Sequence, residues 1–152
     1  MTAHKRATAP SGIVVDASVL AKIVIHEAES DAVTSALAHA ARAGVPLLVL
    51  PLTRFEVGDV LVKLARRAER GAAGIDIDGL VEHSLALVET RDAAPGVADL
   101  ARVHGLSYYD ASYLALATAG RGRKLWTCDA RLGKAAESGG RRVTTEEISG
   151  LA

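Results

Sequence analysis

Three short apolar segments, separated by long stretches with helical spacing, constrain the fold of this chain most strongly. The segments are residues 13–15, 47–50 and 124–128. The first is entirely β-branched and has no polar alternation, which is typical of a parallel strand buried on both faces. Right-handed crossovers between such strands place helices on both faces of the sheet. The sequence therefore predicts an α/β protein, a three-layer α/β/α sandwich around a mostly parallel central sheet.

Apolar spacing and the placement of glycines predict the helices between these segments. The clearest stripe lies in residues 53–70, where Val57, Leu61 and Leu64 recur at helical spacing before Gly71. Further helices are expected over 17–25, 30–43, 76–88, 95–104, 109–119 and 129–137, and a last edge strand over 142–144.

Length, composition and charge narrow the class of protein. The 152 residues suit a single domain, expected at 13–148 between a disordered leader at 1–12 and a tail at 149–152. The single cysteine, Cys128, excludes a disulfide framework and a multi-thiolate metal site, and we expect it to be buried in its strand. No apolar run spans a membrane and the leader lacks a signal-peptide pattern, so a cytoplasmic location without a membrane partner is expected.

The charges of the chain balance. Lysine plus arginine number 18, as do aspartate plus glutamate, which excludes a strongly basic coat for binding nucleic acid. Local basic groups remain candidates for contacts with a phosphate backbone, although each residue alone is more typical of a solvated surface. These groups are Arg66, Arg67 and Arg70; Arg121, Arg123 and Lys124; and Lys134, Arg141 and Arg142.

Acidic residues recur at one edge of the predicted sheet. Asp16 directly follows the first strand, Glu56 lies in the first turns of the helix after the second, and Asp129 follows the third. Asp110 opens the helix before the third strand, within its apolar stripe, where an unpaired carboxylate is costly. Because ligands of open parallel sheets bind beyond the carboxyl ends of the strands, we expect these four acids to form one site.

Each acid also has a simpler explanation. Asp16, Asp110 and Asp129 stand where helices begin and would serve as N-caps, and Glu56 would be a solvated helix residue. Four such acids together favour a shared site, since clustered carboxylates repel one another unless a cation compensates them. Oxygen-only ligands point to Mg²⁺ or Mn²⁺ and not to zinc.

Four segments resemble the PIN-domain family, and specifically the VapC-type ribonuclease toxins of bacterial toxin–antitoxin pairs. They are IVVDASVL at 13–20, PLTRFEV at 51–57, LSYYDASYLALA at 106–117 and LWTCDARL at 125–132. The resemblance implies a compact α/β/α fold with an acidic pocket for one or two Mg²⁺ or Mn²⁺ ions. It implies a catalytic and metal-binding quartet with two supporting hydroxyls: Asp16, Glu56, Asp110 and Asp129, with Ser18 and Thr127.

The activity implied by this resemblance is metal-dependent endoribonucleolytic cleavage by a toxin. Attack of an activated water on the RNA phosphodiester would leave a 5′-phosphate and a 3′-hydroxyl. The implied partners are the RNA substrate, a small antitoxin that fills the pocket, and a second copy in a homodimer or a hetero-oligomer with the antitoxin. Asp59, one turn after Glu56, departs from the family and would either add charge to the pocket or face water.

Other functions stay open. A receiver of the response-regulator type shares the sheet and its acids, but it needs a second acid where Ala17 stands. An interaction module without catalysis is favoured when the quartet is broken, and here it is intact. A DNA-directed nuclease of the same superfamily is compatible with every residue named. The tyrosines Tyr108, Tyr109 and Tyr113 are able to stack bases, but packing around their helix is the expected role.

Overall fold

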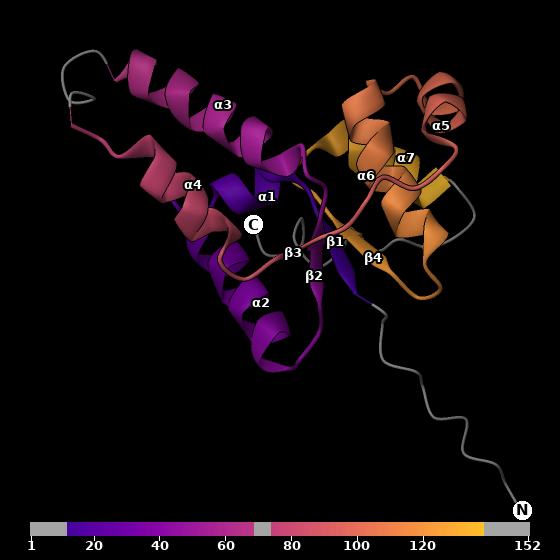
Figure 1. The fold of residues 1–152 in the computed structure, drawn as a ribbon, viewed down its shortest axis with the longest axis horizontal. Coiled ribbons are helices and arrows are strands. Elements are labelled where there is room, and N and C mark those ends of the chain that lie inside the picture. The colour runs from indigo at the N-terminus through magenta and orange to yellow at the C-terminus, as the bar shows by residue number, and fades with distance from the viewer. Residues whose placement is uncertain (1–11, 69–73, 139–152) are drawn as a thin grey trace, which may run out of the picture.

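The computed structural model describes residues 12–68 and 74–138, over which strands and helices alternate (Figure 1). The strands are β1 (Ile13–Val15), β2 (Leu47–Val49), β3 (Glu89–Thr90) and β4 (Lys124–Trp126). The helices are α1 (Ala17–Ala21), α2 (Ser30–Arg42), α3 (Thr53–Arg67), α4 (Ile77–Leu85), α5 (Val97–His104), α6 (Tyr108–Ala119) and α7 (Ala130–Ser138). Gly12, the last residue of the expected leader, is described and buried, whereas residues 1–11, the strand expected at 142–144 and the tail lie outside the described residues.

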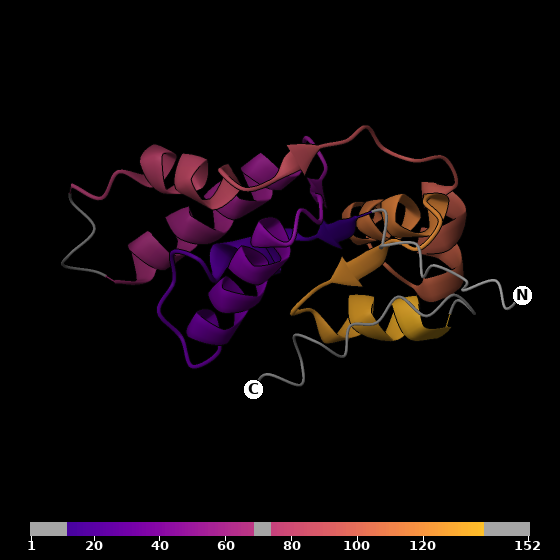
Figure 2. The same cartoon turned by 90° about the horizontal axis from the view of Figure 1, so that it is seen from below.

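The sheet is parallel throughout, in the order β3-β2-β1-β4. Its central strand β1 is fully buried, and Val14 pairs with Leu48 on one side and Leu125 on the other. Ile13 and Val15 pack among α1–α4, whereas Val14 packs among α6 and α7. Figures 1 and 2 show α1–α4 gathered on one side of the sheet and α5–α7 on the other. The predicted three-layer α/β/α sandwich is therefore confirmed.

Three details differ from the sequence prediction. The strand β3 was not predicted, because both of its residues are exposed and polar and carry no apolar pattern. Helix α1 ends at Ala21 and not near residue 25. Strand β4 ends at Trp126, so Cys128 lies beyond the sheet and is exposed; the expectation that it is buried is wrong. No described helix has the length and apolar character needed to cross a membrane.

The backbone turns into the central strand β1 at a glycine. Gly12, directly before β1, has a φ of +135°, and a Cβ added there would lie 2.8 Å from Leu48 Cδ1 and 3.2 Å from the Pro46 carbonyl oxygen. Gly44, after α2, also has a positive φ, +71°, but an added Cβ would meet open space. Gly12 therefore combines a strained backbone with crowding, whereas Gly44 has a strained backbone alone.

We predict that Gly12→Ala destabilises the fold more than Gly44→Ala does. Gly44→Ala costs only the backbone strain, about 1 kcal/mol. Gly12→Ala adds crowding against the buried Leu48, about 1–2 kcal/mol more. Urea denaturation of both variants at one pH measures the difference in the free energy of unfolding. Equal costs at the two positions would contradict the packing described for the start of β1.

Candidate functional site

Asp16 lies at the carboxyl end of β1, where the chain turns into α1. It is the N-cap of α1: its Oδ1 accepts hydrogen bonds from the Val19 N–H at 3.2 Å and from Ser18 Oγ at 2.5 Å. Its Oδ2 accepts a hydrogen bond from Thr127 Oγ1, just beyond β4. Both hydroxyls that the sequence placed beside the pocket thus hold this one carboxylate.

Burial dominates the electrostatics of Asp16. The residue is only 5% exposed, and removal of its carboxyl from water raises the pKa of that group to about 6. The hydrogen bonds from Ser18, Thr127 and the Val19 amide oppose this rise, and the negative charge of Asp129 adds to it. Asp16 is therefore a buried acid that its surroundings hold in place without neutralising its charge.

Glu56 is half-buried in the first turn of α3 and meets a residue from α6. The Tyr113 hydroxyl donates to Glu56 Oε2, and it also lies 2.8 Å from Thr53 Oγ1. Burial and the charges of Asp16 and Asp110 raise the pKa of the Glu56 carboxyl, while the hydrogen bond from Tyr113 lowers it. This contact joins the two helical layers at the carboxyl edge of the sheet.

The sequence analysis missed the role of Tyr113, which is only 1% exposed. The available signal was its place on α6, one turn after Asp110 and on the same side of the helix. Its partner Glu56 is 57 residues away in the chain, so no local pattern identifies the pair. Tyr108 and Tyr109 are exposed, so the expectation that the tyrosines pack around their helix is right only for Tyr113.

Asp110 is half-buried near the start of α6. Ser107 Oγ donates to its Oδ2 at 2.8 Å, and the Asp110 N–H donates to Ser107 Oγ at 3.0 Å. Ser107 is therefore the N-cap of α6, and the simpler explanation of Asp110 as the cap is wrong. Sequence reasoning also missed Ser107, although a serine three residues before an acid is a known start signal for helices.

Asp129 opens α7 and is exposed. Its Oδ1 accepts from the N–H groups of Arg131 at 2.8 Å and Leu132 at 3.0 Å, so it caps the helix as its simpler explanation required. Its own N–H donates to Thr127 Oγ1 at 2.9 Å. Thr127 thus connects Asp129 with Asp16, and the two functions expected of Asp129, cap and site residue, are compatible.

The four acids share one edge of the sheet and influence one another. Charge couples Asp16 to Asp129, and Glu56 to both Asp16 and Asp110. Asp59, by contrast, faces water and pairs with Lys63 at 2.6 Å. The oxygen-only donors and the buried Asp16 suit a hard divalent cation. Within residues 12–68 and 74–138, however, no three acidic, histidine or cysteine side chains are close enough together to hold a metal ion as placed.

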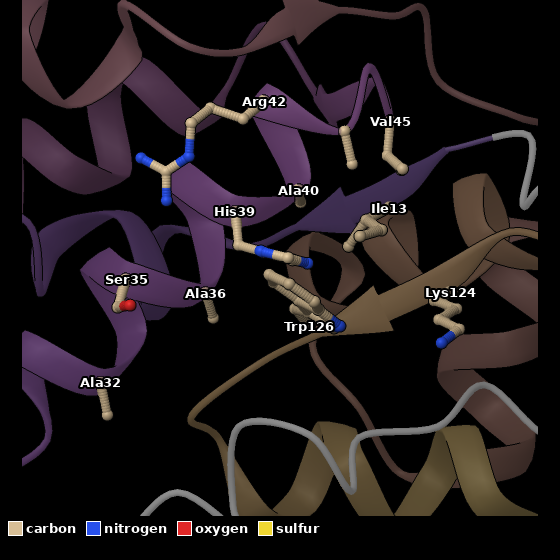
Figure 3. Close-up of a pocket in the computed structure, with 11 residues that line it drawn as sticks. Ile13, Ala32, Ser35, Ala36, His39, Ala40, Arg42, Val45, Lys124 and Trp126 are labelled. Carbon is tan, nitrogen blue, oxygen red and sulfur yellow. The ribbon is translucent and has the colours of Figure 1, made fainter.

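An open groove of about 690 Å³ lies away from these acids (Figure 3). Ala36, His39 and Ala40 of α2 form one wall, and Ile13 and Trp126 of the sheet form another. Its lining is largely apolar and includes none of the four acids. The hollow and the acidic edge are therefore separate features of the surface.

Comparison with known proteins agrees with this geometry. The family model of the PIN domain matches residues 13–138, so the chain belongs to the PIN domain family. PIN domains are generally nucleases. The crystal structure of PAE2754 from Pyrobaculum aerophilum is similar, with 27% sequence identity, a TM-score of 0.61, and coverage of 82% of this chain and 78% of that one. Among curated proteins, none matches this sequence.

We predict that Tyr113→Phe weakens the fold and changes the titration of Glu56. Loss of the hydroxyl removes a buried hydrogen bond to a carboxylate, which costs about 1–3 kcal/mol of unfolding free energy. It also removes an influence that lowers the pKa of Glu56, so that pKa should rise further. Urea denaturation and an NMR titration of the carboxyl measure the two effects. Tyr109→Phe, at a side chain exposed to water, is the matched control and should change neither quantity.

We predict that the metal-free protein loses stability as the pH rises from about 4 to 6. The Asp16 carboxyl has an ordinary pKa of 3.8 and a folded pKa of about 6, so the folded state binds more protons between these values. The stability present below pH 4 is lost as the pH passes through 6, by about 3 kcal/mol from this residue. Glu56 acts in the same direction.

Urea denaturation in EDTA between pH 4 and 8 tests this dependence. Asp16→Asn should remove most of the decrease, because the amide does not titrate. Asp59→Asn, at an exposed acid, should retain it. A wild-type protein whose stability is constant or rises across this range would show that Asp16 is not buried as described.

Proposed function

We propose that this PIN domain is a metal-dependent endoribonuclease and the toxin of a VapC-type toxin–antitoxin pair. The observation that carries the proposal is how the four acids are held. Their partners among the described residues are neutral donors: hydroxyls for Asp16, Glu56 and Asp110, and backbone N–H groups for Asp16 and Asp129. Neutral donors orient a carboxylate and leave its charge available to a cation.

Several acids elsewhere on the surface are held by ion pairs, although Asp76 caps α4 through the Gly79 N–H. Glu27 pairs with Lys22, and Glu82 pairs with Arg54 at 2.5 Å. Such ion pairs neutralise the carboxylate and leave it little to offer a metal. The contrast supports a site at the carboxyl edge of the sheet, where no described lysine or arginine pairs with the four acids to neutralise their negative charge.

In this proposal, Asp16 and Asp110 are the principal ligands of Mg²⁺ or Mn²⁺, and Glu56 and Asp129 complete the set. The bound ion supplies Lewis acidity for hydrolysis of an RNA phosphodiester. Ser18 and Thr127 fix the orientation of the Asp16 carboxylate. Tyr113 and Ser107 do the same for Glu56 and Asp110, and as neutral donors they leave both carboxylates their charge.

The partners belong to the proposal as well. The substrate is RNA in the cytoplasm, and a small antitoxin occupies the acidic pocket when the toxin is inhibited. The toxin assembles as a homodimer or as a hetero-oligomer with its antitoxin. Co-expression with a short reading frame directly upstream tests this assembly: a stable complex supports it, and a monomer that copurifies with no partner contradicts it.

We predict RNA cleavage that requires a divalent cation and the acids. Wild-type protein should cleave RNA in Mg²⁺ or Mn²⁺ and not in EDTA, and Asp110→Asn should lose at least about a hundredfold in rate with an unchanged circular dichroism spectrum. Asp59→Asn is the matched control, because its acid pairs with Lys63 and faces water. Cleavage products measured on denaturing gels decide the outcome.

Two further results would argue against this function. Equal cleavage in EDTA would exclude the metal mechanism. Cleavage of single-stranded DNA in preference to RNA would favour the DNA-directed alternative. Thermal melts give an independent readout: Mg²⁺ at a hundred times its dissociation constant should stabilise the wild type by about 2.7 kcal/mol and leave Asp16→Asn unchanged.

A further inference from the structure

The open groove beside α2 takes no part in the proposed function. Its volume of about 690 Å³ lies within the range of roughly 300–1,000 Å³ that is typical of small-molecule sites (Figure 3). One wall is α2 and the loop that follows it, and the other is the side of β1 and β4 that carries Ile13 and Trp126. The groove is therefore a hollow between a helix and the edge of the described sheet.

Small apolar side chains form the helical wall. Ala32, Ala36 and Ala40 recur every four residues and so lie on one face of α2. The larger Leu37 is buried in the core instead. Trp126, on the opposite wall, is only 3% exposed. An apolar body seated between these walls would be removed from water on two sides, which favours its binding.

The polar side chains of the lining are mainly hydrogen-bond donors. The indole N–H of Trp126 is buried and has no hydrogen-bond partner. His39, Arg42 and Lys124 add basic groups, and no aspartate or glutamate lines the groove in the described part of the chain. A buried donor without a partner costs free energy unless an acceptor reaches it. The lining therefore suits a ligand whose acceptor is negatively charged.

Two of these basic groups also have a simpler explanation. His39 and Arg42 lie in the last turn of α2, where cations stabilise the end of a helix. That explanation does not extend to Lys124, at the start of β4, or to the unpartnered N–H of Trp126. Figure 3 shows His39 extending from α2 toward Trp126, so groups from both walls face the same hollow.

We propose that this groove binds a small organic carboxylate. The apolar body of the ligand lies against the alanines of α2, and its carboxylate accepts hydrogen bonds from the Trp126 N–H, His39 and Lys124. Because Trp126 Nε1 is buried, an oxygen reaches it only when a neighbouring side chain turns aside, and the exposed His39 is placed to do so. The site contains none of the four acids and needs no metal, so it is independent of the ribonuclease proposal.

The fluorescence of Trp126, the only tryptophan of the chain, reports binding directly. The probe is phenylbutyrate, which joins an apolar ring to a carboxylate, titrated in EDTA with selective excitation of tryptophan. A saturable change in the emission of the wild type is expected. Phenylbutyramide has nearly the same shape without the charge and should bind about tenfold more weakly.

Variants test the two parts of the site. Ala36→Leu fills the space beside α2 and should abolish saturable binding. Lys124→Gln should weaken the binding of phenylbutyrate about tenfold and that of the amide less. Trp126→Phe, measured by titration calorimetry, keeps a ring but loses the N–H, and should also weaken binding about tenfold. Arg66→Gln, at an exposed cation in the last turn of α3, is the matched control and should bind as wild type does.

Several results would overturn the site, once circular dichroism has established that each variant is folded. They are no saturable binding by the wild type, equal affinity for the acid and the amide, and unchanged binding in Ala36→Leu. Asp110→Asn should bind phenylbutyrate as wild type does, because the groove lies away from the acids. Loss of binding in that variant would place the ligand at the acidic edge and would also overturn the proposal.

Discussion

The hydrogen bond from Thr127 to Asp16 connects most of the features described for this chain. It joins the ends of β1 and β4 at the carboxyl edge of the sheet, and the same threonine oxygen accepts the Asp129 N–H. The other oxygen of Asp16 caps α1. A carboxylate buried to this degree costs free energy, which its hydroxyl and N–H donors offset only in part, as its raised pKa records. The fold thus retains a destabilising charge where an apolar residue would serve stability better, which is typical of a functional site.

The acids differ from one another in how much freedom they keep. Asp16 is fixed by contacts on both oxygens, whereas Asp129 is exposed and uses one oxygen to cap α7. Glu56 depends on the hydroxyl of Tyr113, which is itself fixed by burial and by Thr53. A cation that draws these groups together would meet one rigid ligand and several that are able to move.

Much of the fold could be predicted because its signals are local. The uninterrupted apolar run of β1 and the helical stripe of α3 each follow from neighbouring residues. Strand β3 could not be predicted from the sequence, because Glu89 and Thr90 join the sheet through pairing with β2 and carry no apolar pattern of their own. The contact of Tyr113 with Glu56 was hidden for a similar reason: periodicity gives the side of the helix that a residue occupies, but not its partner in a distant segment. The positions of the acids could be predicted because each depends on a strand end or a helix start.

Helix capping and a place in the acidic site are compatible explanations for Asp16 and Asp129, because the topology brings helix starts to one edge of the sheet. Helices α3 and α7 directly follow β2 and β4, and α6 leads directly into β4, so all three begin at the carboxyl edge of the parallel sheet. Helix starts present free N–H groups and partial positive charge, which favour an acid there whatever its later use. Several helix starts at one edge therefore favour several acids there. The partial positive charge of the same helix starts reduces the repulsion between these acids without a lysine or arginine. Two of the four acids, Asp16 and Asp129, cap helices, whereas Glu56 and Asp110 lie in the first turns of α3 and α6. What distinguishes the group from unrelated acids at helix starts is the burial of Asp16 and the coupling of its charge to Asp129.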